Sequence, residues 1–167
     1  NESLIAGEEP ELCYRMRAAG WSILRLEAPM ATHDAAMTMF SQWWRRAVRS
    51  GHAYAERAWL HRGSPSRPWR REVRRDWIWG VILPGAAIAA AWPTGGWSLL
   101  LFALYPTWTW KISSERRRRF GESIGDAYLY AGFAMLSKFP SVLGQSLYWA
   151  RRARRTESTL IEYKAPE

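Results

Sequence analysis

Residues 77–110 read WIWGVILPGAAIAAAWPTGGWSLLLFALYPTWTW and contain no Asp, Glu, Lys or Arg. An uncharged run of this length exceeds the ~18 residues that suggest a membrane span. The sequence PTGG at residues 93–96 is typical of a turn and divides the run near its middle. We therefore expect residues 77–112 to form an apolar helical hairpin that crosses the bilayer or enters it and returns.

Basic residues lie on both sides of this run, as RREVRR at residues 70–75 and RRRR at residues 116–119. The whole chain has 24 Lys and Arg against 15 Asp and Glu, and it contains 12 Trp. Such a composition suits either nucleic acid or an anionic membrane surface. Because the arginines gather at the ends of the apolar run, the pattern favours membrane lipids as partners and no nucleic acid. It also places both ends of the hairpin on the cytoplasmic face.

The rest of the chain predicts helices with one short strand. Acidic residues before an apolar stripe and a terminating Gly20 predict a helix over residues 8–20, and the run Trp21–Leu26 is typical of a strand. The expected segments are an α/β part over residues 1–60 with a second helix over 35–60, a basic linker over 61–76, the hairpin over 77–112, a basic loop with interfacial amphipathic helices over 113–155, and a tail over 156–167. The predicted fold class is thus an α/β remnant followed by a mainly α-helical membrane region.

The sequence NESLIAGEEPELCYR at residues 1–15, followed by Gly20 and Trp21, contains an acidic motif. It resembles the end of the catalytic domain of family 2 glycosyltransferases, where D-E-x-L precedes G-E-D-x-D-L-x-x-R. The resemblance implies that residues 1–60 are the C-terminal part of a catalytic domain of the nucleotide-sugar-binding fold called GT-A. It also implies inverting transfer of a sugar from a nucleotide-sugar donor.

The resemblance carries the catalytic base of that family onto Glu9, with Glu8 beside it. A carboxylate within hydrogen-bond reach of an acceptor hydroxyl can take its proton as the hydroxyl attacks the anomeric carbon. Glu9 stands where the family motif has Asp, so the assignment of the base among Glu8, Glu9 and Glu11 stays open. Glu11 is the expected substrate-binding residue of this motif. In the alternative interpretation, the acidic residues only complement the helix dipole, a contribution of ~0.3–1 kcal/mol.

His33 follows the expected strand, at a place where many GT-A enzymes have a histidine that helps to bind the metal or the diphosphate. An imidazole can ligate a divalent cation such as Mn²⁺, so we expect His33 to be a metal ligand or, alternatively, a structural residue. The resemblance implies a divalent metal cofactor, Mg²⁺ or Mn²⁺, that is bound mainly by residues absent from this chain.

The sequence QWWRR at residues 42–46 partly resembles the Q-x-x-R-W motif of processive family members, but Arg46 replaces the Trp of that motif. Aromatic faces can stack on sugar rings, and guanidinium groups can pair with a diphosphate. The expected substrate-binding residues here are therefore Trp43, Trp44, Arg45, Arg46 and Arg49. The alternative is a solvated or lipid-facing basic helix.

Glycine-rich phosphate loops and a metal-binding D-x-D triplet are missing from the sequence. We therefore expect a fragment that lacks the nucleotide-binding half of the enzyme and is inactive alone. The expected acceptor is a lipid-linked or membrane-proximal saccharide in cell-envelope or exopolysaccharide synthesis, at the cytoplasmic face of the bacterial inner membrane. One alternative is a non-enzymatic, membrane-associated module that binds anionic lipid, and another is a soluble enzyme with a buried hairpin.

Overall fold

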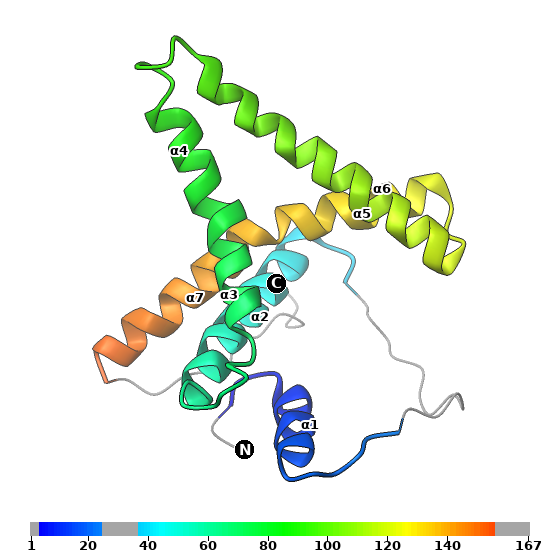
Figure 1. Ribbon diagram of the computed structural model, residues 1–167, viewed down its shortest axis with the longest axis vertical. Helices are drawn as coiled ribbons and strands as arrows, with labels where there is room; N and C mark the ends of the chain where they lie inside the picture. The colour runs from blue at the N-terminus through cyan, green and yellow to red at the C-terminus, as the bar shows by residue number, and fades with distance from the viewer. Residues whose placement is uncertain (1–3, 25–36, 156–167) are drawn as a thin grey trace.

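A computed structural model describes residues 4–24 and 37–155 (Figure 1). Within these two ranges every regular element is helical and no strand is present. The elements are α1 (Glu8–Ala18), α2 (Phe40–Leu60), α3 (Arg70–Trp77), the π-helical η1 (Ile78–Ile82), α4 (Leu83–Ala89), the 3₁₀-helical η2 (Trp97–Ala103), α5 (Leu104–Phe120), α6 (Ile124–Leu136) and α7 (Lys138–Ala153).

The predicted α/β part is wrong for the described chain. Helix α1 confirms the helix expected over residues 8–20, and α2 confirms most of the second helix. Residues 21–24, the described part of the expected strand, form no strand, whereas residues 25–26 lie outside the described ranges. The physical reason is that a strand must pair its backbone groups with a neighbouring strand, and the described segments offer none.

The core lies where α2 packs against α7, at the centre of the molecule (Figure 1). Two glycines permit this approach. A methyl group added at Gly51 would overlap the carbonyl oxygen of Ser141, and one added at Gly144 would overlap that of Val48. The backbones of the two helices are therefore in direct contact, and Val142 and Tyr148 are buried beside the crossing.

The hairpin consists of a continuous helical run through α3, η1 and α4, a turn, and a second run through η2 and α5. The turn is where the sequence predicts it. Gly95 and Gly96 both have positive φ, at 59° and 90°, which glycine adopts without steric cost. Ser98 Oγ donates to the Ala87 carbonyl at 2.7 Å and joins the two arms. The expected arrangement of two helical segments joined by a turn is thus confirmed.

The prediction that the hairpin crosses a membrane, by contrast, is wrong for the described residues. Within residues 4–24 and 37–155, the structure contains no helix that is both long enough and apolar enough to span a bilayer. The uncharged run is divided among a π-helical segment, the seven-residue α4, a turn and a 3₁₀ segment. Its outer parts continue into α3 and α5, which both contain several arginines.

The segments around the hairpin also differ from the expected organisation. Residues 61–69 form turns, as a linker would, but residues 70–76 begin the helical run of α3. Residues 104–120 continue the hairpin as α5, and α6 then lies beside α5. Helix α7, which was expected at a lipid interface, packs the face that carries Ser141, Gly144 and Tyr148 against α2, while Leu143 and Leu147 stay exposed.

Replacing Gly144 by alanine is expected to destabilise the protein by about 1–3 kcal/mol or more, since the added methyl group overpacks the α2–α7 contact. The measurement is urea unfolding followed by circular dichroism. Gly132→Ala is the matched control, because Gly132 is also helical and has no atom within 4 Å of an added Cβ. That control should be neutral or stabilising, and equal destabilisation of both variants would contradict the close crossing.

His52 is completely buried beside the crossing, with its ring edge against Tyr148 at a centroid distance of 5.3 Å. Burial, reinforced by the positive charge of Arg151, lowers the pKa of His52 from 6.5 to about 4. Glu56 Oε2 lies 3.7 Å from His52 Nδ1, but desolvation outweighs this attraction. His52 is therefore neutral at pH 7, and the contact with Glu56 is not an ion pair there.

Because the unfolded chain binds a proton at His52 near pH 6.5 and the folded chain only near pH 4, acid favours unfolding in this window. The free energy of unfolding is expected to fall by about 3 kcal/mol from this group alone between pH 7 and pH 4. His52→Leu should remove that part of the pH dependence, as measured by denaturant unfolding at each pH. Parallel pH profiles for the two proteins would contradict the assignment.

Candidate functional site

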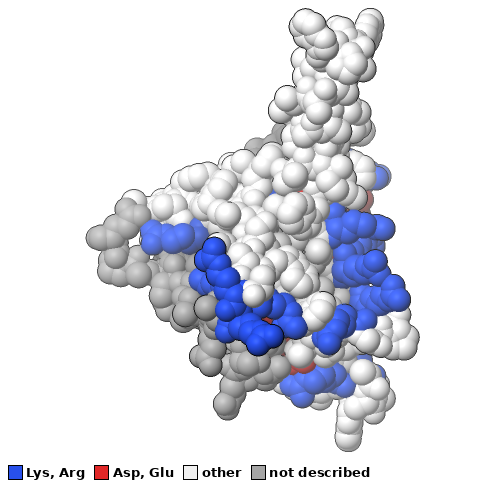
Figure 2. All heavy atoms as spheres, turned by 90° about the vertical axis from the view of Figure 1, so that its left-hand side faces the viewer, with Lys and Arg blue, Asp and Glu red and all other residues white. Residues whose placement is uncertain are grey.

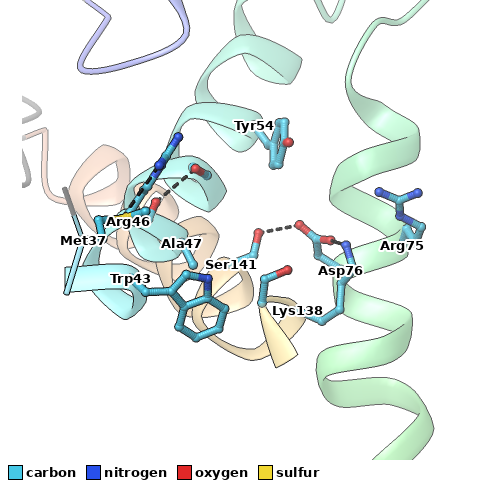
Figure 3. Close-up of a pocket in the computed structure, with 11 residues that line it drawn as sticks. Met37, Trp43, Arg46, Ala47, Tyr54, Arg75, Asp76, Lys138 and Ser141 are labelled. Atoms are coloured by element: carbon cyan, nitrogen blue, oxygen red, sulfur yellow. Dashed lines mark hydrogen bonds and ion pairs between the residues drawn. The ribbon is translucent and has the colours of Figure 1, made fainter. Parts of the chain in front are cut away.

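A cavity of about 350 Å³ opens between α2, α3 and α7 (Figure 3). It contains aromatic rings, hydroxyl groups and charged side chains of both signs. Its lining comprises Met37, Trp43, Arg46, Ala47, Ser50, Tyr54, Arg75, Asp76, Ser137, Lys138 and Ser141. Apart from Met37 and Ser137, which lie outside the helices, these residues come from three separate helices, so the cavity exists only in the folded chain.

One face of α2 supplies the first wall. Trp43, Ala47, Ser50 and Tyr54 follow one another at spacings of four, three and four residues, which places them on one side of a helix. Burial, together with the negative charge of Asp76, raises the pKa of Tyr54 above its usual value. The Tyr54 hydroxyl therefore keeps its proton at neutral pH and is available as a hydrogen-bond donor.

Asp76 forms the centre of a buried polar cluster on the opposite wall. Its Oδ1 accepts from Lys138 Nζ at 2.8 Å, and its Oδ2 accepts from Ser141 Oγ and from Gln145 Nε2, the latter at 3.1 Å. Figure 3 shows the Asp76 side chain directed from α3 towards the Lys138 and Ser141 side chains of α7. The carboxylate is thus neutralised and fully hydrogen-bonded within the fold.

Sequence reasoning did not find Asp76 or Lys138. A signal was present, since Asp76 is the last charged residue before the uncharged run and Lys138 is the only charged residue between 127 and 150. Isolated opposite charges in apolar surroundings are usually paired, because an unpaired buried charge is very costly. That pairing spans 62 residues and is not visible as a local motif.

The acidic motif begins α1. Gly7 precedes the helix and has a left-handed backbone, with φ at 79°. A Cβ added at Gly7 would lie only 2.6–2.9 Å from atoms of the Arg57 guanidinium. Arg57 Nη1 donates to the Gly7 carbonyl at 3.4 Å. Glu8 and Glu9 are exposed in the first turn of the helix. The left-handed backbone favours glycine here, and the Arg57 side chain fills the space beside it.

Glu11 lies on the other side of the same helix and is 1% exposed. Arg15 Nε donates to both of its carboxylate oxygens at 2.9 Å, and His61 Nε2 lies 3.0 Å from Oε1. Burial opposes ionisation, but the hydrogen bonds from Arg15 and His61 hold the pKa of Glu11 below 4.5. Glu11, which sequence reasoning placed on the substrate side, here connects α1 to the residue after α2.

The expected substrate-binding residues of α2 separate into two groups. Trp43 and Arg46 line the cavity. Trp44 packs near Phe40 at a ring-centroid distance of 6.0 Å, and Arg49 Nη2 donates to the Ile5 carbonyl at 2.8 Å. Arg45 is half-buried outside that lining. The metal-ligand candidate His33 lies outside the described residues.

Side chains of His, Cys, Asp and Glu do not gather in groups of three that could hold a metal, as far as residues 4–24 and 37–155 are concerned. In comparisons with known proteins, no family model, no curated protein and no solved structure matches the chain. Interpretation of the site therefore depends on its own residues.

Lys138→Met is expected to destabilise the protein by about 3–5 kcal/mol, because it leaves the buried Asp76 carboxylate without its counter-charge. The double variant Asp76→Asn/Lys138→Met should regain most of this loss, since no buried charge remains. Denaturant unfolding of the single variants and the double variant measures the coupling. If the losses in unfolding free energy of the two single variants simply add in the double variant, the ion pair between Asp76 and Lys138 does not stabilise the fold.

Proposed function

We propose that this chain is part of an inverting glycosyltransferase that moves a sugar from a nucleotide-sugar donor to a lipid-linked or membrane-proximal acceptor. The observation that carries the proposal is the acidic start of α1. The left-handed backbone favours glycine at Gly7, with the Arg57 guanidinium packed against it, while Glu8 and Glu9 remain exposed in the first helical turn. This arrangement suits a motif that presents a carboxylate to a reactant.

In the proposed reaction Glu9 accepts the proton of the acceptor hydroxyl. The hydroxyl oxygen forms a bond to the anomeric carbon of the donor as the bond from that carbon to the phosphate oxygen breaks. The nucleoside diphosphate leaves with the bonding electron pair. Glu8 is the neighbouring carboxylate, and the ion pair of Glu11 with Arg15 supports the helix that holds both residues.

The donor site is assigned to residues absent from this chain, because the 167 residues contain no D-x-D triplet. The Mg²⁺ or Mn²⁺ that the resemblance implies would be held mainly by the same absent residues, with His33 as the candidate within this chain. No step of the proposal depends on a metal ligand among the described residues. We accordingly expect the isolated chain to have no transferase activity.

The cavity that Trp43 and Arg46 line is proposed as the site that binds the acceptor. An indole face can stack on a sugar ring, and the surrounding hydroxyl and charged groups can hydrogen-bond to its substituents. Arg57 joins this cavity to the acidic motif, since its guanidinium lies against Gly7 and 5.4 Å from the Tyr54 ring centroid. One side chain thus contacts both parts of the proposed site.

A second candidate function is binding to an anionic lipid surface, either in place of catalysis or as support for it. The hairpin end projects from the body without a charged residue, and Lys and Arg gather lower on the molecule (Figure 2). Trp92 and Trp97 at the turn are 95% and 75% exposed. Exposed indoles above a basic surface suit the interface of a membrane that contains anionic headgroups.

Glu9→Gln, in an enzyme that includes the nucleotide-binding half, is expected to lower kcat about 10²–10⁴-fold, because the amide cannot accept the acceptor proton. Initial rates with a nucleotide-sugar donor measure the loss, and circular dichroism establishes that the variant is folded. Glu8→Gln is the matched control, with the same change one residue away, and it should cost much less. The assignment is falsified if folded Glu9→Gln retains normal turnover.

The lipid-binding alternative predicts different results. The protein should then sediment with vesicles that contain anionic lipid. The double variant Trp92→Ser/Trp97→Ser should reduce this binding, whereas Glu9→Gln should leave it unchanged. Vesicle binding without transfer by the longer enzyme would favour the non-enzymatic module. Transfer that depends on Glu9 would favour the enzyme.

A further inference from the structure

We propose that the cavity between α2, α3 and α7 binds a phosphate monoester dianion. Three cationic residues, Arg46, Arg75 and Lys138, and one anionic residue, Asp76, line it. The net formal charge of the lining is therefore +2. A phosphate monoester has a charge of about −1.5 to −2 at neutral pH, so the lining and the ligand neutralise each other.

The negative charge of Asp76 does not prevent an anion from binding, because the positive charge of Lys138 already balances it. Its two oxygens accept from Lys138, Ser141 and Gln145. The carboxylate acts as a positioning group that holds Lys138 Nζ at the wall of the cavity, where the ammonium retains two further hydrogens for a ligand. The Lys138 side chain is 13% exposed, which limits competition from water.

Arg75 supplies an exposed positive charge of the lining. It precedes Asp76 on α3 and is exposed. The Tyr54 and Ser50 hydroxyls are neutral groups on the α2 wall. Phosphate oxygens accept charge-assisted hydrogen bonds from guanidinium and ammonium groups and weaker ones from hydroxyls. Trp43 also lines the cavity (Figure 3) and offers an apolar surface for the carbon part of the ester.

This inference deepens the proposed function, and its interpretation as acceptor recognition rests on that function: the acceptor would bear a phosphate group. Binding itself requires neither Glu9 nor a donor. The phosphate could belong to a small soluble ester or to a lipid headgroup, and both present the same dianion to the cavity.

The experiment measures binding of glycerol 3-phosphate and, separately, of vesicles that contain phosphatidic acid in phosphatidylcholine. Arg75→Gln should weaken binding about fivefold, as expected for loss of an exposed ionic contact. Arg74→Gln is the matched control, since Arg74 is exposed on the same helix but is not part of the lining. Its effect should stay below about twofold, because salt screens a charge that does not touch the ligand.

Binding of either probe with selective loss in Arg75→Gln supports the site. Competition between the two probes assigns both to one cavity, whereas vesicle binding alone identifies a lipid headgroup as the source of the phosphate. Equal losses in Arg74→Gln and Arg75→Gln, or no saturable binding of either probe, would overturn the proposal. Glu9→Gln should bind normally, so inactivity of that variant and failure of the phosphate site are separate results.

Discussion

The direct backbone contact between α2 and α7 determines the positions of the other helices. It depends on Gly51 and Gly144, because any larger side chain at either residue would overlap a carbonyl group of the facing helix. Once α7 is held against α2, its first turns face the end of α3. The cavity wall, the buried histidine and the base of the hairpin all depend on this crossing.

The hairpin is attached to this core by contacts near η1. A methyl group at Gly80 would lie 2.8 Å from the Lys138 carbonyl, so the π-helical segment also approaches α7 closely. Trp79 packs near Tyr105 and Trp108, each at a centroid distance of 5.4 Å, and Tyr105 stacks on Phe139. Aromatic packing thus fixes the hairpin at its base, whereas its far end projects outward (Figure 1).

Helix α2 serves both parts of the proposed site. One of its faces lines the cavity through Trp43 and Tyr54, and its last turns support α1 through Arg57. Burial lowers the pKa of Arg57, but the nearby Tyr54 and acidic residues oppose this effect. The guanidinium also lies 4.9 Å from the Trp69 ring centroid. A single rigid helix therefore relates the acidic motif to the cavity.

The sequence by itself determined the features that arise from local interactions. Helices α1 and α2, the turn at Gly95–Gly96 and the exposed acidic residues after Gly7 all follow from residues close together in the chain. Tertiary structure decided the rest. It showed no sheet in the described residues and no membrane-spanning helix among them, and it connected Asp76 to Lys138 across 62 residues. It also separated Trp43 and Arg46, which line the cavity, from Arg49, which binds Ile5. These outcomes depend on which helix faces pack together, and the spacing of residues within one helix does not contain that information.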